Sequence, residues 1–473
     1  MYKDIMNKIK DCFLLDTEQP NCYLIYAPLK IILFAVNKTG ANVFLQLKKG
    51  NILPGAEKIL EVLEKSKINL LPSNLNKNHH VDITICPTFR CQLRCLYCFA
   101  LGGEKISDLS LDASKAAIDL VLHRHSLQEI QSSRLIWHGG GEPTLAWEVL
   151  RKTSLYHRQE AIALGIKPHL SIVSNGIWTK EVKGWIIDNF DRITISCDGP
   201  SDIQDKQRPL FNGLPSSHFV YETLRAMAYH RVNFGIRATI TENNVKRMPE
   251  MVRFFHNLCH PRTLQFERLS ICGRCEESKI QAGLPEDYIK YFKEAFEVAK
   301  DLDINLVCSG VRIFRRTNYY CGVGGHAICV TPEGLLTTCH RVDNTLHALA
   351  KKLVFGKWDG VQYQWKQKQL EQLQSSLSVN NFDRCRDCFC KYTCAGGCIT
   401  SRVNPVEKQN SDEHCQIIKE LSRFRLISIA EGRGILEDIK TKEEVNYHEK
   451  GTRKPGRIKE QYHYKRHNST YSI

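Results

Sequence analysis

Two hydrophobic periodicities alternate along the chain from residue 81 to about residue 305. Short runs rich in Val, Ile, Thr and aromatic residues, typical of strands, are separated by longer stretches with apolar residues at helical spacing. One such stretch is "LDASKAAIDLVLHRH", in which Asp112 is a candidate N-cap. The strand-like runs cover residues 81–88, 134–143, 169–176, 192–200, 234–241 and 263–270. Strands that are each followed by a helix predict a parallel sheet with right-handed crossovers, as in a partial (β/α)6 barrel.

A smaller unit precedes this region. The segment "CYLIYAPLKIILFAVNKTGANVFLQLKKG" contains two or three short strand-like runs, and "AEKILEVLEKS" after it has helical spacing. We therefore expect residues 1–80 to form a small α/β module. A strand edge in such a module offers main-chain hydrogen bonds to an extended peptide. A cap on the bottom of the barrel is the alternative role.

Composition narrows the class of protein. The chain has 473 residues, 42% of them hydrophobic, which suggests two or three domains. It has no run of 18 apolar residues, so we expect no membrane span. Its start, "MYKDIMNKIKDCFLLD", lacks the apolar core and cleavage site of a signal peptide. We therefore expect a cytoplasmic protein. In a reducing compartment its 20 cysteines are better explained as metal ligands than as disulfide partners.

The net charge of +15 makes nucleic-acid binding a function to consider. Part of it lies in the last segment, "KGTRKPGRIKEQYHYKRHNSTYSI", which has seven Lys or Arg and one Glu. A basic end interrupted by Gly and Pro is typical of a solvated segment, so we interpret residues 426–473 as a flexible tail. RNA or an acidic substrate is the alternative partner of this tail.

Three cysteines follow the first barrel strand in "CQLRCLYC", at Cys91, Cys95 and Cys98. A disulfide needs two thiols, and a closed tetrahedral zinc site takes four ligands. Three thiols predict a metal centre with one open position. The segments "HGGGEP", "SNG" and "SCDGP" end the next three strands, and in a β/α barrel strand ends share the face on which sites are built.

This order of motifs resembles the radical S-adenosylmethionine (radical SAM) superfamily. The resemblance implies that Cys91, Cys95 and Cys98 hold three irons of a [4Fe-4S] cluster, and that S-adenosylmethionine binds the fourth. It implies a 5′-deoxyadenosyl radical that abstracts hydrogen from a C–H bond, and a reducing partner such as flavodoxin or ferredoxin. No catalytic residue of the protein itself is assigned. The residues that the resemblance places against S-adenosylmethionine are Tyr97, Gly140, Gly141, Glu142, Asn175, Ser196, Arg208 and Leu269.

Some of these roles have a direct physical reason. The ring of Tyr97 would lie beside the adenine, and Leu269 would line the adenine pocket. Gly140 and Gly141 lack a Cβ, so the backbone approaches the amino group of the ligand closely. Ser196 would supply a hydroxyl. Arg208 would pair with the ligand carboxylate, for which its planar fork is suited.

A second cysteine field follows in residues 306–425. The spacing from Cys321 through "GLLTTC" and "CRDCFCKYTCAGGC" to Cys415 resembles the SPASM extension of peptide-modifying radical SAM enzymes. A zinc ribbon is the alternative for a single CxxC. The resemblance implies two auxiliary [4Fe-4S] clusters. The outer cluster would use Cys385, Cys388, Cys394 and Cys415, and the inner cluster would use Cys321, Cys339 and Cys398.

The fourth ligand of the inner cluster is left open. Related sequences carry a further cysteine where this chain has Arg315, so Cys308, Cys329 or a substrate group is a candidate. We expect Cys390 not to be a ligand, and Cys86 and Cys197 to pack in strands. The remaining pair, Cys272 and Cys275, is expected to be idle or near the site, with a thiol hydrogen donor or a substrate contact as the alternative.

The sequence thus predicts an α/β protein with a radical SAM partial barrel at 81–305 and a SPASM domain at 306–425. Its function would be modification of a ribosomal precursor peptide (RiPP maturation), with the leader of the peptide bound by residues 1–80. A sulfatase maturase that forms formylglycine is the alternative. The long N-terminal segment and His340, which stands where sulfatase-maturing relatives have an aspartate, weaken that alternative. A non-catalytic zinc or RNA scaffold is the third hypothesis.

Overall fold

The computed structural model of the chain describes residues 2–64, 80–126, 130–322, 327–345, 347–403 and 405–436. The basic segment 437–473 lies outside the described residues. No helix in the described ranges combines the length and the apolar character needed to cross a lipid bilayer.

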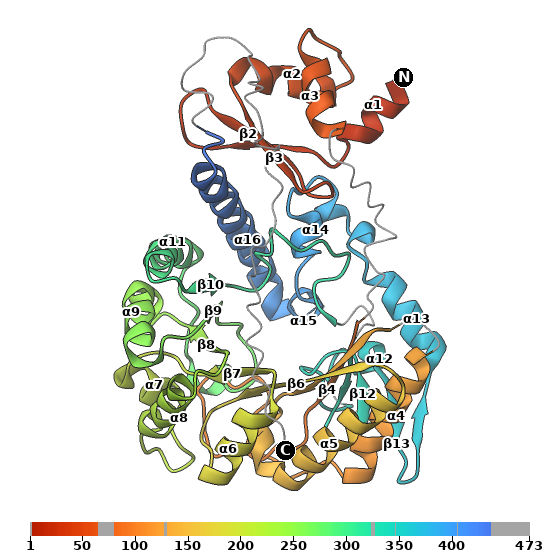
Figure 1. Ribbon diagram of the computed structural model, residues 1–473, viewed down its shortest axis with the longest axis vertical. Helices are drawn as coiled ribbons and strands as arrows, with labels where there is room; N and C mark the ends of the chain where they lie inside the picture. Colours follow the sequence, from red (N-terminus) through yellow and green to blue (C-terminus); the bar gives the residue numbers. More distant parts are fainter. Residues whose placement is uncertain are drawn as a thin grey trace, which may run out of the picture.

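All six predicted barrel strands form, and they pair in parallel in chain order. Successive strands lie side by side because each strand is joined to the next by a crossover. Figure 1 shows these strands in the lower part of the molecule. They are β4 (His80–Ile85), β5 (Ser132–Trp137), β6 (Lys167–Ser174), β7 (Arg192–Ser196), β8 (Phe234–Ile240) and β9 (Thr263–Arg268). A seventh parallel strand, β10 (Asn305–Val307), pairs with β9 and was not predicted.

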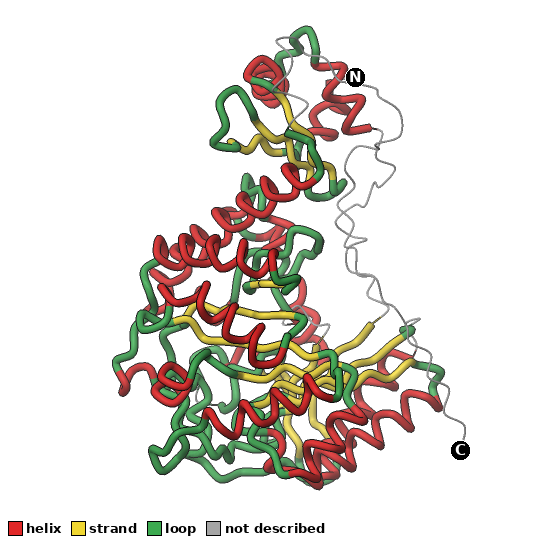
Figure 2. The backbone as a smooth tube through the Cα atoms, turned by 60° about the vertical axis from the view of Figure 1, so that its left-hand side comes forward, coloured by secondary structure: helices red, strands yellow, loops and turns green. Residues whose placement is uncertain are grey.

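Helices cover the outer face of the sheet (Figure 2). They are α4 (Leu111–Ser126), α5 (Trp147–Ala163), α6 (Lys180–Asn189), α7 (Ser201–Gln207), α8 (Ser217–Tyr229), α9 (Met248–Cys259) and α11 (Pro285–Asp301), with the 3-10 turns η2 (Pro143–Ala146) and η3 (Val245–Arg247). The short helix α10 (Cys275–Ser278) packs elsewhere, near Leu96, Tyr97 and Leu269. The predicted cap Asp112 lies inside the first turn of α4. The hydroxyl of Ser110 accepts from Ala113 N instead, at 3.1 Å.

Burial alternates along β4, β5 and β8, with every second residue packed beneath these helices. In β8, for example, Phe234, Ile236, Ala238 and Ile240 belong to the main hydrophobic core. The residues between them, Arg237 among them, are half-buried and face the barrel interior, because side chains alternate across a strand. The interior is therefore lined by polar residues.

The C-terminal region continues the same sheet. Strand β11 (Ala327–Val330) pairs in parallel with β4, and an antiparallel series follows: β12 (Leu335–Thr337), β13 (Val354–Trp358) and β14 (Tyr363–Trp365). The predicted boundary at residues 305 and 306 thus falls inside β10 and does not divide the sheet, which has 11 strands. Gly334 makes the turn before β12 with φ +73°, and a Cβ there would lie 2.8 Å from Trp358 Cβ.

Short helices carry the cysteine-rich segment above this sheet. They are α12 (Ala350–Leu353), α13 (Gln367–Ser376), α14 (Lys391–Cys394) and α15 (Ile399–Val403), with η5 (Val379–Asn381) and η6 (Asp383–Cys385). The long helix α16 (Pro405–Gly432) comes next and packs against α11, where the rings of Phe296 and Phe424 are 5.4 Å apart.

The N-terminal module is a three-stranded antiparallel sheet with three helices. The strands are β1 (Phe13–Asp16), β2 (Tyr23–Ala27) and β3 (Ile32–Val36), and the helices are α1 (Tyr2–Ile9), α2 (Lys38–Lys48) and α3 (Ala56–Glu64). The runs "CYLIY" and "IILFAVN" form strands as predicted. The third strand is "FLLD", while "ANVFLQL" lies in α2.

This sheet is buried on both faces. One face packs on the three helices, and the other packs on Ile313 and on α16. Leu426, Ala430 and Leu436 are buried in the second contact, so the predicted flexible tail does not begin at residue 426. In Figure 1, α16 connects the N-terminal sheet to the barrel.

Candidate active site and cysteine groups

The three cysteines of "CQLRCLYC" lie in a loop at the carboxyl end of β4. Main-chain N–H groups point at two of the sulfurs: Leu93 N is 3.4 Å from Cys91 Sγ, and Gly102 N is 3.3 Å from Cys98 Sγ. Cys91 interacts electrostatically with both Cys95 and Cys98, so the three thiols gather in one place. Burial raises the pKa of Cys91 to about 12, and thiolates here therefore need a metal cation.

The glycine loop after β5 packs backbone to backbone on this cysteine loop. Gly141 N donates to Thr88 O at 2.8 Å, and a Cβ at Gly141 would lie 2.0 Å from Arg90 O. A Cβ at Gly102 would lie 2.9 Å from Gly140 O. The predicted need for glycine is thus explained by the contact of two loops, and approach of Gly140 and Gly141 to S-adenosylmethionine stays a prediction.

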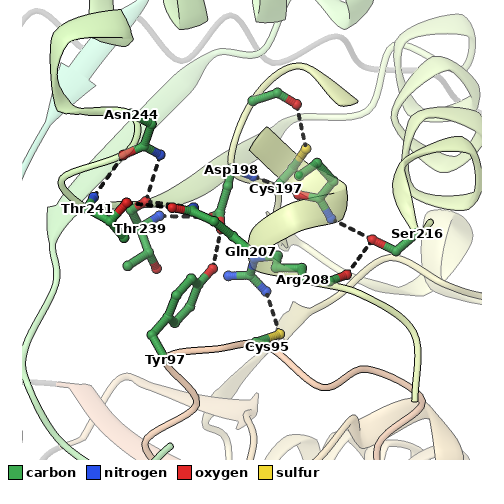
Figure 3. Close-up of polar contacts among 12 residues, drawn as sticks. Cys95, Tyr97, Cys197, Asp198, Gln207, Arg208, Ser216, Thr239, Thr241 and Asn244 are labelled. Atoms are coloured by element: carbon green, nitrogen blue, oxygen red, sulfur yellow. Dashed lines mark hydrogen bonds and ion pairs between the residues drawn. The ribbon is translucent and has the colours of Figure 1, made fainter. Parts of the chain in front are cut away.

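A buried ion pair lies beside the cysteine loop (Figure 3). Arg208 Nε is 3.2 Å from Asp198 Oδ1, and the hydroxyl of Tyr97 donates to Asp198 Oδ2. The guanidinium lies 5.3 Å from the centre of the Tyr97 ring, and Nη1 is 3.8 Å from Cys95 Sγ. Arg208 thus lies against Tyr97 and Cys95 of the cluster loop, and the contacts of both residues with S-adenosylmethionine stay predictions.

The sequence analysis missed Asp198. Its Oδ2 accepts from Gln207 Nε2 at 2.8 Å and its Oδ1 from Thr239 N at 3.0 Å, so it joins β7 to β8 as well as to Arg208. The signal was present in "SCDGP", because a buried arginine needs a counterion from a neighbouring strand end.

Four other predicted cofactor residues have clear positions. Glu142 is buried and accepts from Ser174 Oγ at 2.7 Å and from Asn175 N at 2.8 Å, and burial raises its pKa. The Asn175 side chain donates to Gln92 Oε1 at 3.2 Å, which ties the strand-end loop to the cysteine loop. Ser196 ends β7 on its interior face, and Leu269 packs with Tyr97. Their contacts to S-adenosylmethionine stay predictions.

A second arginine that was not predicted holds the cluster loop from the other side. Arg274 Nη1 donates to Cys95 O at 2.9 Å, Nη2 donates to Gly102 O at 3.2 Å, and an ion pair of 2.6 Å links it to Glu104. The loop that carries it packs tightly: Gly273 has φ +58°, and a Cβ there would lie 2.4 Å from Cys98 O. Arg274 is thus placed to fix the loop that would hold the cluster.

We expect Arg274→Met to weaken retention of that cluster. The change leaves two inward-facing carbonyl groups without their charged donor, a loss of roughly 1.5–3 kcal/mol, or about ten- to hundredfold in the rate of cluster loss. The measurement is the rate at which an iron chelator bleaches the reconstituted protein under anaerobic conditions. The control is Arg253→Met on the exposed face of α9. Equal bleaching rates in the two variants would contradict the role of Arg274.

The thiols of Cys272 and Cys275 flank Arg274. Cys275 is buried near Cys98, and Cys272 Sγ donates to Ser270 O at 3.4 Å. Both lie beside the cluster loop. These contacts are compatible with the prediction that the two thiols are idle or only near the site.

Two histidines meet where the barrel interior opens. The rings of His138, which follows β5, and His340, which follows Cys339, have centroids 4.4 Å apart, and Phe99 lies 5.6 Å from His340. Burial and then the charge of Arg237 lower the pKa of His138 to about 4, so it is neutral near pH 7. Gly139 N donates to His138 Nδ1 at 2.8 Å, which leaves the ring proton on Nε2.

The downstream cysteines gather in the two predicted sets. Cys394 and Cys415 interact electrostatically with Cys385 and Cys388, and Cys339 does so with Cys321 and Cys398. Cys390 is buried, and a hydrogen bond from its thiol lowers the pKa of Cys388 to about 6. It therefore contacts the sulfur of a predicted ligand.

The candidate fourth ligands of the predicted inner cluster lie in different parts of the structure. Cys308 is buried in the barrel core, beside Tyr288. Cys329 lies 3.9 Å from Cys86 across the β11–β4 pair and within electrostatic reach of Cys339. Arg315 is near Cys321. A small open pocket beside Cys321 is lined by Tyr319, Tyr320, Cys321, Phe382, Gly397 and Arg402, among others.

The donor set suits iron–sulfur clusters. Within the described ranges, no three His, Cys, Asp or Glu side chains converge closely enough to hold a single metal ion. A [4Fe-4S] cluster takes its thiolates on different irons, so its ligands stand farther apart. The loop of Cys91, Cys95 and Cys98, with N–H groups directed at the sulfurs, fits such a cluster.

Comparisons with known proteins agree with this geometry. The sequence profile of the Radical SAM superfamily matches residues 85–255. Uncharacterized protein MJ0907 of Methanocaldococcus jannaschii is 29% identical over 168 residues, which are 35% of this chain, and the match spans 55% of that protein. The cysteine-type anaerobic sulfatase-maturating enzyme of Clostridium perfringens is 24% identical over 378 residues, 72% of this chain and 95% of that enzyme.

A solved structure extends the likeness to the fold. Native anSMEcpe with bound AdoMet matches with a TM-score of 0.58 at 21% identity, over 74% of this chain and 99% of that chain. The superfamily match begins at the last residue of β4 and ends within α9, so it takes in the cysteine loop, the glycine loop and the pair of Asp198 and Arg208. Residues 85–255 therefore form a radical SAM domain, and the family match together with the C. perfringens relative supports a radical SAM enzyme.

Proposed function

We propose that this enzyme modifies a ribosomally made precursor peptide. The family implies a [4Fe-4S] cluster and S-adenosylmethionine, which when bound supply a 5′-deoxyadenosyl radical that takes a hydrogen atom from the substrate. The protein would hold the cluster with Cys91, Cys95 and Cys98 and orient S-adenosylmethionine through Arg208 and Tyr97. A flavodoxin or ferredoxin would deliver the electron.

The observation that carries the proposal is the N-terminal sheet. Among the described residues, β1 and β3 pair with β2 alone, so each has one edge without a neighbouring strand. Such an edge binds an extended peptide through main-chain hydrogen bonds, whatever its side chains. Leader recognition needs this property, because the leader is not the part that reacts.

The same module touches the cysteine-rich region. Arg316 Nη1 donates to Leu29 O at 2.9 Å, and Leu29 packs against Val379, Cys385 and Tyr392. A leader held on the N-terminal sheet would therefore be tethered to the region that carries the predicted auxiliary cysteines. Tethering raises the effective concentration of the attached core peptide at the barrel.

The two auxiliary clusters belong to this proposal. The outer set of Cys385, Cys388, Cys394 and Cys415 would hold one, and Cys321, Cys339 and Cys398 would hold the other. Their role would be removal of an electron from the substrate radical or positioning of the peptide. Cys329 is the better protein candidate for the fourth inner position, because it lies near Cys339 while Cys308 lies in the barrel core.

Sulfatase maturation is the second candidate, favoured by the match to 95% of the C. perfringens enzyme. A solved structure of anSMEcpe holds AdoMet and the Cp18Cys peptide. His340 at the barrel mouth and the module before β4 are the features that weigh against it here.

Adding a leader peptide is expected to protect an edge strand of the N-terminal sheet. The probe is the N-terminal half of a candidate precursor, taken from a peptide-encoding frame if one adjoins the gene, added to the full chain and followed by hydrogen–deuterium exchange. Amides of β1 or β3 should exchange roughly tenfold more slowly at a leader concentration of about ten times Kd, because bound strands must dissociate before they open. The intact chain is needed, since removing residues 1–77 would expose Leu426 and Ala430.

The control is a scrambled leader of equal composition, and a cysteine-containing sulfatase peptide serves as the second comparison. Protection of β1 or β3 by the leader alone supports peptide maturation. Protection confined to the barrel, or turnover of the sulfatase peptide with no leader effect, would favour the second candidate.

A further inference from the structure

Four carboxylates on the described strands and strand-end loops of the barrel each have a partner. Asp82 pairs with Arg134 at 2.8 Å, and Asp198 pairs with Arg208 at 3.2 Å. Glu142 accepts from Ser174 and Asn175, and Oε1 of Glu267 accepts from Gln265 Nε2 at 2.7 Å and Ser309 N at 2.8 Å. These carboxylates therefore already form ion pairs or hydrogen bonds with groups on strand-end loops and neighbouring strands.

Arg237 differs from the other interior arginines. It faces the interior from the middle of β8, directly opposite Ser196 in the strand register. Among the described residues, no side chain or carbonyl forms a hydrogen bond or ion pair with its guanidinium. A guanidinium in a half-buried site retains five donors, and its charge is costly there unless an anion approaches it.

Two histidine rings lie within electrostatic reach of Arg237. His138 presents Nε2–H, because its Nδ1 accepts from Gly139 N. His340 stacks on His138 at 4.4 Å, and within the described part of the chain its ring nitrogens have no hydrogen-bond partner. The charge of Arg237 acts on both rings, so the three side chains share one region of the interior.

We propose that Arg237, with His138 and His340 beside it, binds a carboxylate of the peptide substrate. This inference rests on the proposed function. The segment that enters the barrel then carries an aspartate, a glutamate or a C-terminal carboxylate at this point. A planar carboxylate accepts two parallel hydrogen bonds from a guanidinium and a third from an imidazole N–H, which fixes its orientation near Ser196.

S-adenosylmethionine also carries a carboxylate, for which the sequence resemblance assigns Arg208. The two sources separate by measurement. If Arg237 held the carboxylate of S-adenosylmethionine, Arg237→Gln would weaken cofactor binding. If Arg237 instead binds the substrate carboxylate, Arg237→Gln should leave the affinity for S-adenosylmethionine within about twofold of the unaltered protein. A twofold change corresponds to less than 0.5 kcal/mol, because about 1.4 kcal/mol corresponds to a tenfold change.

The test uses reconstituted full-length protein with saturating S-adenosylmethionine and no reductant. The probes are radiolabelled N-acetyl-glutamate methylamide and its glutamine counterpart, which has the same shape without the charge, and binding is followed by equilibrium dialysis. We expect the glutamate probe to bind about tenfold more tightly or better. Arg237→Gln should remove the difference, Arg237→Lys should retain part of it, and Arg253→Gln on the surface of α9 should leave it unchanged.

Equal binding of the two probes to the unaltered protein, or binding of neither at millimolar concentration, would overturn the inference even if Arg237→Gln failed to fold. So would weaker binding of S-adenosylmethionine by Arg237→Gln. If no precursor peptide is turned over while the dependence on Arg237 holds, the carboxylate site stands and the proposed function falls. If a precursor is matured without any preference between the probes, the function stands and this site falls.

Discussion

Replacing Cys91, Cys95 and Cys98 together by Ala is expected to abolish cleavage of S-adenosylmethionine. The triple variant should lose about four irons per chain, out of roughly twelve on the proposed content of three [4Fe-4S] clusters. The physical reason is local: the loop gathers these thiols with N–H groups directed at two of the sulfurs, and Arg208 and Arg274 hold the loop from both sides. The measurement is 5′-deoxyadenosine formed after anaerobic reduction.

A matched control replaces Cys272, a half-buried thiol in the loop that packs on the cluster loop. Cys272→Ala should keep both its iron and its cofactor cleavage. Formation of 5′-deoxyadenosine by the triple variant at the rate of this control would show that the reactive cluster is bound elsewhere.

Loss of the outer auxiliary cluster should stop peptide modification while cofactor cleavage continues. Cys388→Ala removes a thiol that interacts electrostatically with Cys394 and Cys415, in a region above the sheet and apart from the cysteine loop. Iron should again fall by about four per chain, and the cysteine-rich segment should become less stable because metal binding there is coupled to folding. The measurements are product mass from the precursor and 5′-deoxyadenosine from the same reaction.

Cys390→Ala is the matched control for this variant. Its thiol is buried and hydrogen-bonded to Cys388, yet the predicted ligand set excludes it. We expect it to retain all iron and most product. Full product formation by Cys388→Ala, in protein shown to lack one cluster, would contradict a role of the outer set in the reaction of the substrate.

The local sequence pattern was sufficient to predict the barrel and the grouping of the cysteines in the first loop. Six strand-like runs with helical stretches between them left a parallel arrangement, because each crossover returns the chain to the same end of the sheet. The cysteine spacing likewise placed Cys91, Cys95 and Cys98 in one loop, where the structure brings the three thiols together. The division of the downstream thiols into two sets came from the resemblance to the SPASM extension, and the electrostatic contacts among these thiols are compatible with it.

Contacts between segments far apart in the sequence could not be predicted from local pattern. The pairing of β11 with β4 joins residues more than 240 positions apart, and neither strand carries a signal for its partner. Residues 426–436 resembled the start of a solvated tail, yet Leu426, Ala430 and Leu436 are buried against the N-terminal sheet. Burial of that kind depends on which surface a helix meets, and composition does not record it.

The sequence by itself therefore determined the chemistry of the reactive loop, since ligand type and spacing are local properties of the chain. Only the tertiary structure decided the surroundings of that loop. It paired Arg208 with Asp198, placed Arg274 against Cys95 and Gly102, and brought His340 from the C-terminal region onto His138 beside Arg237. Each of these contacts joins side chains from separate elements, whose distances follow from packing of the whole sheet and not from any one stretch of sequence.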